Sequence, residues 1–136
     1  MAPMVINGTI IPRYGYNDLV VWVPREFNTQ ADYLANVALH EGKDSFLMDL
    51  HVIEACKKIR PLGIQFFVDG GYEPDTGNAS CGVCARIFQM CPNGSWQAQI
   101  IVSNSYYFPR GFLNSSFESE AMALGIALRL YNDYFI

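Results

Sequence analysis

The chain has 136 residues, of which 51% are hydrophobic and 14% aromatic, a composition that suits one compact domain and excludes a mainly disordered or coiled-coil chain. Lys and Arg total 9 against 13 Asp and Glu, giving a formal net charge of -4. No run of basic residues occurs, which argues against a nucleic-acid binder that relies on counterion release from many phosphates. This argument does not exclude a metal-dependent protein that binds nucleic acid through bound cations.

The first residues, MAPMVINGTIIPRYGY, show no basic stretch followed by a long apolar stretch, as a secretory signal would. No segment approaches the roughly 18 apolar residues that a membrane-spanning helix needs. We therefore expect a soluble, intracellular protein that does not enter a membrane.

The first half of the chain predicts a strand followed by helices. Leu19–Val23 is a short run rich in β-branched residues and closed by Pro24, which is typical of a buried strand. Asn28 stands in a typical helix-capping position, and apolar residues recur at helical spacing from there to about His40. Similar spacing over Ser45–Arg60 predicts a second, connecting helix.

The second half predicts three antiparallel strands followed by a helix. Ser115 and Glu118 have the spacing of a capping box, in which each side chain accepts a hydrogen bond from the other residue's backbone N–H, and they open the clearest helical pattern of the chain. The predicted strands are 64–68, 80–89 and 96–103, and the predicted turns between them are 73–78 and 91–94.

Four cysteines raise the question of a zinc site or of ordinary packing. Cys81 and Cys84 have the spacing of a metal-binding pair, with Cys91 following, but no second pair and no nearby histidine complete the pattern. The surrounding small and apolar residues favour a strand in which reduced cysteines pack.

Two acids stand at the edges of predicted core elements. Asp69 follows the apolar run Ile64–Val68, and Glu120 precedes an apolar helical face. Carboxylates beside apolar surface cost free energy unless they are compensated, and one divalent cation can compensate two of them. The alternatives are an Asx-type turn at Asp69 and a helix-dipole interaction at Glu120, but neither alternative explains both acids. The residues of that helical face are Leu124, Ala127, Leu128 and Tyr131.

The motifs around these acids resemble the first half of a type-1 ribonuclease H domain. The motifs are FVDGG at Phe67–Gly71, GNASCGV at Gly77–Val83 and FESEAMAL at Phe117–Leu124. In that family a strand ending in Asp leads into a three-strand meander and then a helix that opens with Glu. The resemblance implies that Asp69 is the first-strand metal ligand and Glu120 the first-helix ligand.

The earlier stretch VWVPREFNTQADYLANVA at Val21–Ala38 resembles the last strand, loop and closing helix of the reverse-transcriptase and retroelement forms of the same family. It implies that Asp32 is the late metal-ligand aspartate, for which a first-turn helix acid is the alternative. The usual loop histidine has no counterpart, and His40 and His51 have the character of surface residues.

The end of the family pattern thus precedes its beginning, and the fourth strand with its aspartate has no counterpart. We expect residues 1–44 to be a C-terminal strand–helix portion, 45–63 a helical connector, and 64–136 an N-terminal portion with three strands and a helix. The chain is then either a slice across two tandem domains, which we favour, or one permuted domain. We expect the two portions to pack together, because each leaves an apolar face uncovered.

The fold class implied by the resemblance is α/β: an incomplete or permuted ribonuclease H-like mixed sheet, with three antiparallel strands plus a parallel strand and flanking helices. The implied function is hydrolysis of the RNA strand of an RNA–DNA hybrid by two Mg²⁺ or Mn²⁺ ions on Asp32, Asp69 and Glu120.

The alternative function is a catalytically inactive retroelement remnant or an interaction module. Such a module would use aromatic residues such as Tyr106–Phe108, for which packing at the end of a strand is the better explanation. An exposed sheet edge at the place of the missing fourth strand predicts self-association.

Overall fold

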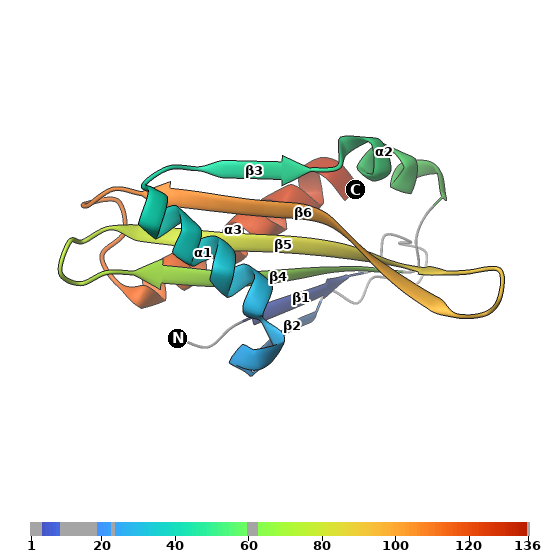
Figure 1. Cartoon of the computed structure of the whole chain (residues 1–136), viewed down its shortest axis with the longest axis horizontal. Helices are drawn as coiled ribbons and strands as arrows, with labels where there is room; N and C mark the ends of the chain where they lie inside the picture. The colour runs from blue at the N-terminus through green and yellow to red at the C-terminus, as the bar shows by residue number, and fades with distance from the viewer. Residues whose placement is uncertain (1–3, 9–18, 23, 60–62, 136) are drawn as a thin grey trace.

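The computed structural model describes residues 4–8, 19–22, 24–59 and 63–135. These residues form six strands, three α-helices and a short 3₁₀ helix at Arg25–Phe27 (Figure 1). In chain order the elements are β1 (Met4–Gly8), β2 (Leu19–Trp22), α1 (Thr29–Glu41), β3 (Ser45–Met48), α2 (Leu50–Ile59), β4 (Gly63–Tyr72), β5 (Ala79–Met90), β6 (Trp96–Phe108) and α3 (Ser116–Phe135).

The six strands form one sheet with the order β2-β1-β4-β5-β6-β3. The three consecutive antiparallel strands predicted from the sequence are β4, β5 and β6, and the prediction of an α/β fold is confirmed at that level. The expected parallel strand is not found among the described pairings, which are all antiparallel. The reason is that β2 pairs with β1, and β1 lies between β2 and β4.

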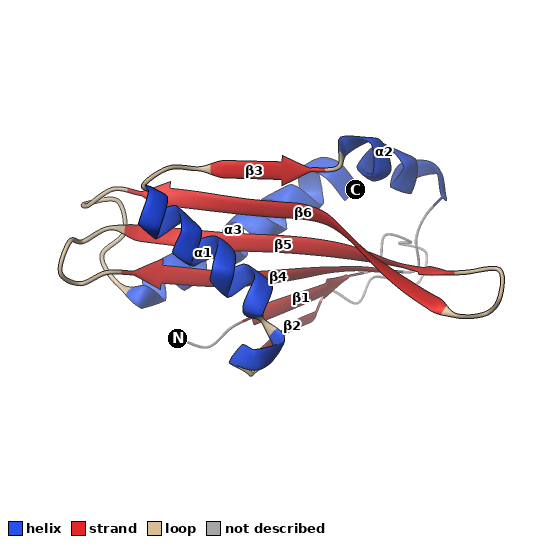
Figure 2. Ribbon diagram, viewed as in Figure 1, coloured by secondary structure: helices blue, strands red, loops and turns tan. Residues whose placement is uncertain are grey.

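Helices cover both faces of the sheet, as Figure 2 shows. Helix α1 packs on one face against β4, β5 and β6, while α3 packs on the other face against β4 and β5. The two predicted portions of the chain therefore do pack together. No helix within the described residues is long and apolar enough to cross a membrane.

The main core lies between the sheet and α3. Alternate residues of β4 are buried toward α3, and Phe66 meets the rings of Tyr131 and Phe135 edge-on at centroid distances of 6.2 and 6.0 Å. The buried stripe of α3 differs slightly from the predicted one, because Leu128 is exposed. The buried α3 residues are Ser119, Glu120, Ala123, Ala127, Tyr131 and Phe135.

Several features differ from the sequence prediction, among them the strand expected over 96–103, which continues to Phe108 as β6. The helix expected over Ser45–Arg60 begins only at Leu50, because the preceding strand β3 pairs with the edge of β6. The strand expected to end at Val68 continues to Tyr72 by pairing with β5. The sheet edge expected to be open at the place of the fourth strand, beside β4, is instead paired with β1. The expected open edge is therefore wrong at this place, and self-association itself stays a prediction.

Other local predictions hold with small changes. The Ser115 hydroxyl accepts a hydrogen bond from the Glu118 N–H at 3.1 Å, as the capping box predicts. The Glu118 carboxylate accepts from the Asn114 N–H at 3.0 Å and from the Ser115 hydroxyl at 3.4 Å. Tyr106 packs on Phe46 with ring centroids 5.1 Å apart and accepts a hydrogen bond from Asn104 at 2.9 Å. The aromatic run is thus part of strand packing.

Candidate active site

Asp69 lies inside β4 opposite Gly82 of β5, and only 6% of the residue is exposed. A Cβ atom at Gly82 would collide with the carbonyl oxygen of Ala31 and lie 2.7 Å from the backbone nitrogen of Ala35. The missing side chain therefore lets the backbone of α1 rest directly on β5. This close approach brings the first turn of α1 to the level of Asp69.

Two buried hydrogen bonds fix α1 in that position. The Asn28 side-chain amide donates to the carbonyl oxygen of Val68 at 2.8 Å, and the Ser105 hydroxyl donates to the carbonyl oxygen of Leu34 at 2.7 Å. Asn28 is the residue before the helix, as predicted, but its side chain makes no capping hydrogen bond. It joins α1 to the strand residue just before Asp69 instead.

Asp32, on α1, interacts with Asp69 through their side chains. The pKa of Asp69 is raised to about 7 by its burial, by a side-chain hydrogen bond with Asp32 and by repulsion from the charges of Asp32 and Glu120. The backbone N–H of Gly70 donates to Asp69 at 3.0 Å and opposes part of this rise. Two carboxyl groups in such contact need either a shared proton or a cation between them.

Glu120 approaches the same strand from the opposite face of the sheet. A Cβ atom at Gly70 would lie 2.5 Å from the backbone nitrogen of Glu120, so the first turn of α3 can sit against β4 only because Gly70 has no side chain. Glu120 is 2% exposed, and this burial raises its pKa. Within the described residues its buried Oε1 atom has no hydrogen-bond partner.

The Asp32–Asp69 pair lies in an open polar cleft of about 560 Å³. Gly70 lines this cleft, whereas Glu120 behind it does not. Among the residues that the structure describes, no group of three His, Cys, Asp or Glu side chains is placed to hold one metal ion. The structure thus joins two of the three predicted ligands and leaves the third buried close by.

The donor set nevertheless fits a hard divalent cation. Mg²⁺ and Mn²⁺ prefer carboxylate oxygens, often with several water ligands retained. The Asp32–Asp69 contact supplies two adjacent carboxylates that repel each other without a proton or a cation. The buried Oε1 of Glu120 has no hydrogen-bond partner among the described residues, but Glu120 does not line the cleft and forms no group of three ligands with the two aspartates.

Sequence reasoning missed the polar neighbours of Asp32. Asn36 donates a hydrogen bond to Asp32 at 3.3 Å, and both residues line the cleft together with His40. Their spacing of four residues, Asp32, Asn36 and His40, was the available signal, because it places all three on one face of a helix. His40 is exposed, as expected, yet it lies at the cleft. Arg25, Tyr72 and Glu73 also line it.

Comparison of this chain with protein-family models, curated proteins and solved structures gives no match. The fold and the cleft define an α/β protein with a paired-carboxylate site. Its function has to be inferred from that site and from the sequence motifs that form it.

Proposed function

We propose that this protein has a ribonuclease H-like fold and hydrolyses the RNA strand of an RNA–DNA hybrid with the help of Mg²⁺ or Mn²⁺. The observation that carries this proposal is the contact between Asp32 and Asp69 in a polar cleft. These two acids come from opposite ends of the resemblance, and the packing of α1 on β4 and β5 joins them.

The arrangement of elements also supports the proposal. The meander β4-β5-β6 is followed by α3 on one face of the sheet, and α1 lies on the other face. This is the arrangement expected when the closing helix of a ribonuclease H-like domain packs on the first three strands. The motif VDGG then lies in β4, with NTQAD at the start of α1 on one face of the sheet and ESEA at the start of α3 on the other face.

In this proposal Asp32 and Asp69 hold the metal ions, and Glu120 is the third ligand. Bound metal ions would supply an activated water and stabilise the leaving oxygen of the phosphodiester. To bind a metal ion, Asp69 has to lose the proton that its burial and its contact with Asp32 favour. Asn36 orients the Asp32 carboxylate through its hydrogen bond, and Arg25 brings a guanidinium group to the cleft that can pair with a substrate phosphate.

The test is cleavage of an end-labelled RNA–DNA hybrid in the presence of Mg²⁺. We expect cleavage by the unaltered protein and a loss of at least about a hundredfold in Asp69→Asn, because the amide cannot replace a carboxylate ligand. The matched control is Asp75→Asn, since Asp75 lies in an exposed turn and should leave the rate unchanged. Cleavage that persists in Asp69→Asn would contradict the proposal.

A second candidate is a fold of the same kind that binds nucleic acid without cleaving it. The burial of Glu120 away from the cleft favours it. So does the absence of acids from β1, which occupies the place beside β4 and has the sequence MVING. Calorimetric titration separates the two candidates: this one requires hybrid binding with no Mg²⁺ binding at millimolar concentration.

A further inference from the structure

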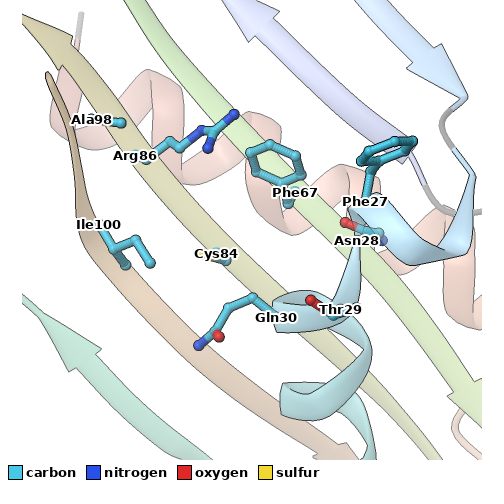
Figure 3. A pocket seen from close by; sticks show the side chains of 9 residues that line it. All are labelled: Phe27, Asn28, Thr29, Gln30, Phe67, Cys84, Arg86, Ala98 and Ile100. Carbon is cyan, nitrogen blue, oxygen red and sulfur yellow. The ribbon is translucent and has the colours of Figure 1, made fainter. Parts of the chain in front are cut away.

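A second pocket, of about 320 Å³, lies on the α1 face of the sheet (Figure 3). It shares no lining residue with the polar cleft of Asp32 and Asp69. It is lined by the residues that lead into α1 and by β4, β5 and β6. The same first turns of α1 contribute Asp32 to the cleft. The two sites are therefore neighbours on either side of one helix end.

Two aromatic rings stand at this pocket. Phe27 comes from the 3₁₀ helix before α1, and Phe67 comes from β4; both line the pocket, and Figure 3 shows both rings. Phe27 is 68% exposed, which leaves apolar ring surface in contact with water. Such rings offer faces on which a flat ligand ring can stack.

Arg86 brings a positive charge to the same place. Its guanidinium carbon lies 4.8 Å from the centroid of Phe67 and 4.9 Å from that of Phe88, and its Nε donates to Gln65 at 2.9 Å. These contacts hold the group in a fixed orientation. Within the described part of the chain no acid forms a salt bridge with it, so its terminal N–H groups can serve an anion.

Asn28 adds a buried acceptor. Only 1% of the residue is exposed, and it lines the pocket beside Phe27 (Figure 3). Its amide nitrogen is already bonded to Val68, whereas its Oδ1 atom has no hydrogen-bond partner among the described residues. A buried acceptor left unpaired costs free energy, and a ligand N–H group would relieve that cost.

We propose that this pocket binds a nucleobase together with its adjoining phosphate. The base stacks on Phe27 and Phe67, one of its N–H groups donates to Asn28, and the phosphate accepts from Arg86. A purely apolar occupant would satisfy the rings but leave both polar groups unpaired. The volume suits one nucleotide, at the small end of ligand pockets.

The inference rests on the proposed function in one respect. If the cleft holds a nucleic-acid strand, the pocket across the α1 terminus is placed to receive an unpaired nucleotide of that strand. A free nucleotide would make the same contacts as a nucleotide within a strand. The experiment therefore includes a free nucleotide and an oligonucleotide.

The experiment is an NMR titration of the intact protein in EDTA with AMP, and in parallel with a short single-stranded oligoadenylate. We expect saturable shifts from at least one of these probes, and tighter binding of the oligoadenylate if the pocket serves a strand. Phe27→Ala should weaken binding by about tenfold, as loss of a stacking partner does. The matched control is Phe112→Ala, because Phe112 is also 68% exposed but lies away from the pocket.

Arg86→Gln tests the phosphate contact, with adenosine as the reference ligand. We expect this variant to bind AMP no better than the unaltered protein binds adenosine. Absence of saturable binding by both AMP and the oligonucleotide, or equal binding by Phe27→Ala and Phe112→Ala, would overturn the inference. Because these titrations contain neither metal nor hydrolysis, Asp69→Asn should bind the probes normally, which separates failure here from failure of the proposed activity.

Discussion

The carboxyl group of Asp69 is buried next to Asp32, and these surroundings raise its pKa to about 7. Its unfolded value is near 3.8, so the folded state holds this proton over a range of pH in which the unfolded state has lost it. By linkage, the stabilising contribution of the protonated group is complete below the lower value and is lost as the pH rises through the higher one.

We therefore predict that the metal-free protein becomes less stable between about pH 4 and pH 7, by on the order of 3 kcal/mol. Urea denaturation at several pH values in EDTA measures this slope. Asp69→Asn carries no titrating proton at this position and should show a flatter profile. An identical slope in the variant and the unaltered protein would mean that Asp69 is not the group responsible.

At the scale of elements, the seating of α1 depends on a glycine in β5. Gly82 lies where any side chain would meet the backbone of Ala31 and Ala35. Hydrogen bonds from Asn28 and Ser105 then hold the helix at this short distance. A shift of α1 away from the sheet would separate Asp32 from Asp69. The short distance between the backbones of α1 and β5 at Gly82 therefore controls the geometry of the cleft.

We predict that Gly82→Ala destabilises the protein by about 2 kcal/mol or more, because the new methyl group has no room. Gly125→Ala is the matched control: Gly125 is an exposed residue of α3, and a Cβ atom there would meet nothing within 4 Å. The control should be about 0.5–1 kcal/mol more stable, since alanine favours a helix over glycine. Chemical denaturation of both variants gives the two values, and similar losses in both would refute the role of Gly82.

At the scale of the whole molecule, the candidate metal site joins parts of the chain that are distant in sequence. Asp32 belongs to the portion predicted as the end of one domain, and Asp69 and Glu120 belong to the portion predicted as the beginning of another. The sheet and α1 bring these portions together in one fold. Whether the order arose from a slice across tandem domains or from a permutation stays a prediction that the flanking coding sequence can test.

A cation bound across these portions should stabilise the folded chain as a whole. We predict that 10 mM Mg²⁺ raises the melting temperature by several degrees at neutral pH, because only the folded state brings the ligands together. Asp32→Asn and Asp69→Asn should each abolish most of the rise, and Asp75→Asn should retain it. Differential scanning calorimetry measures the melting temperature of the unaltered protein and the three variants with and without Mg²⁺. An equal rise in all four proteins would show that the ion binds elsewhere.

Local sequence patterns determined the strands β4, β5 and β6, the turns between them, and the helices α1 and α3, because alternation, turn residues and helix caps act within a few neighbours. The same patterns singled out Asp69 and Glu120, and the resemblance to the ribonuclease H family added Asp32. They failed at Ser45–Met48, where pairing with the edge of β6 gives a strand in place of a helix, and at β1, which no local signal had indicated.

Only the tertiary structure decided how these acids stand to one another. The contact of Asp32 with Asp69 depends on the absence of a side chain at Gly82, and the burial of Glu120 depends on its absence at Gly70. The pocket formed by Phe27, Asn28, Phe67 and Arg86 likewise has no local signature, because its residues come from separate elements. Sequence therefore determined the chemistry available to this protein, and long-range packing decided which groups share a site.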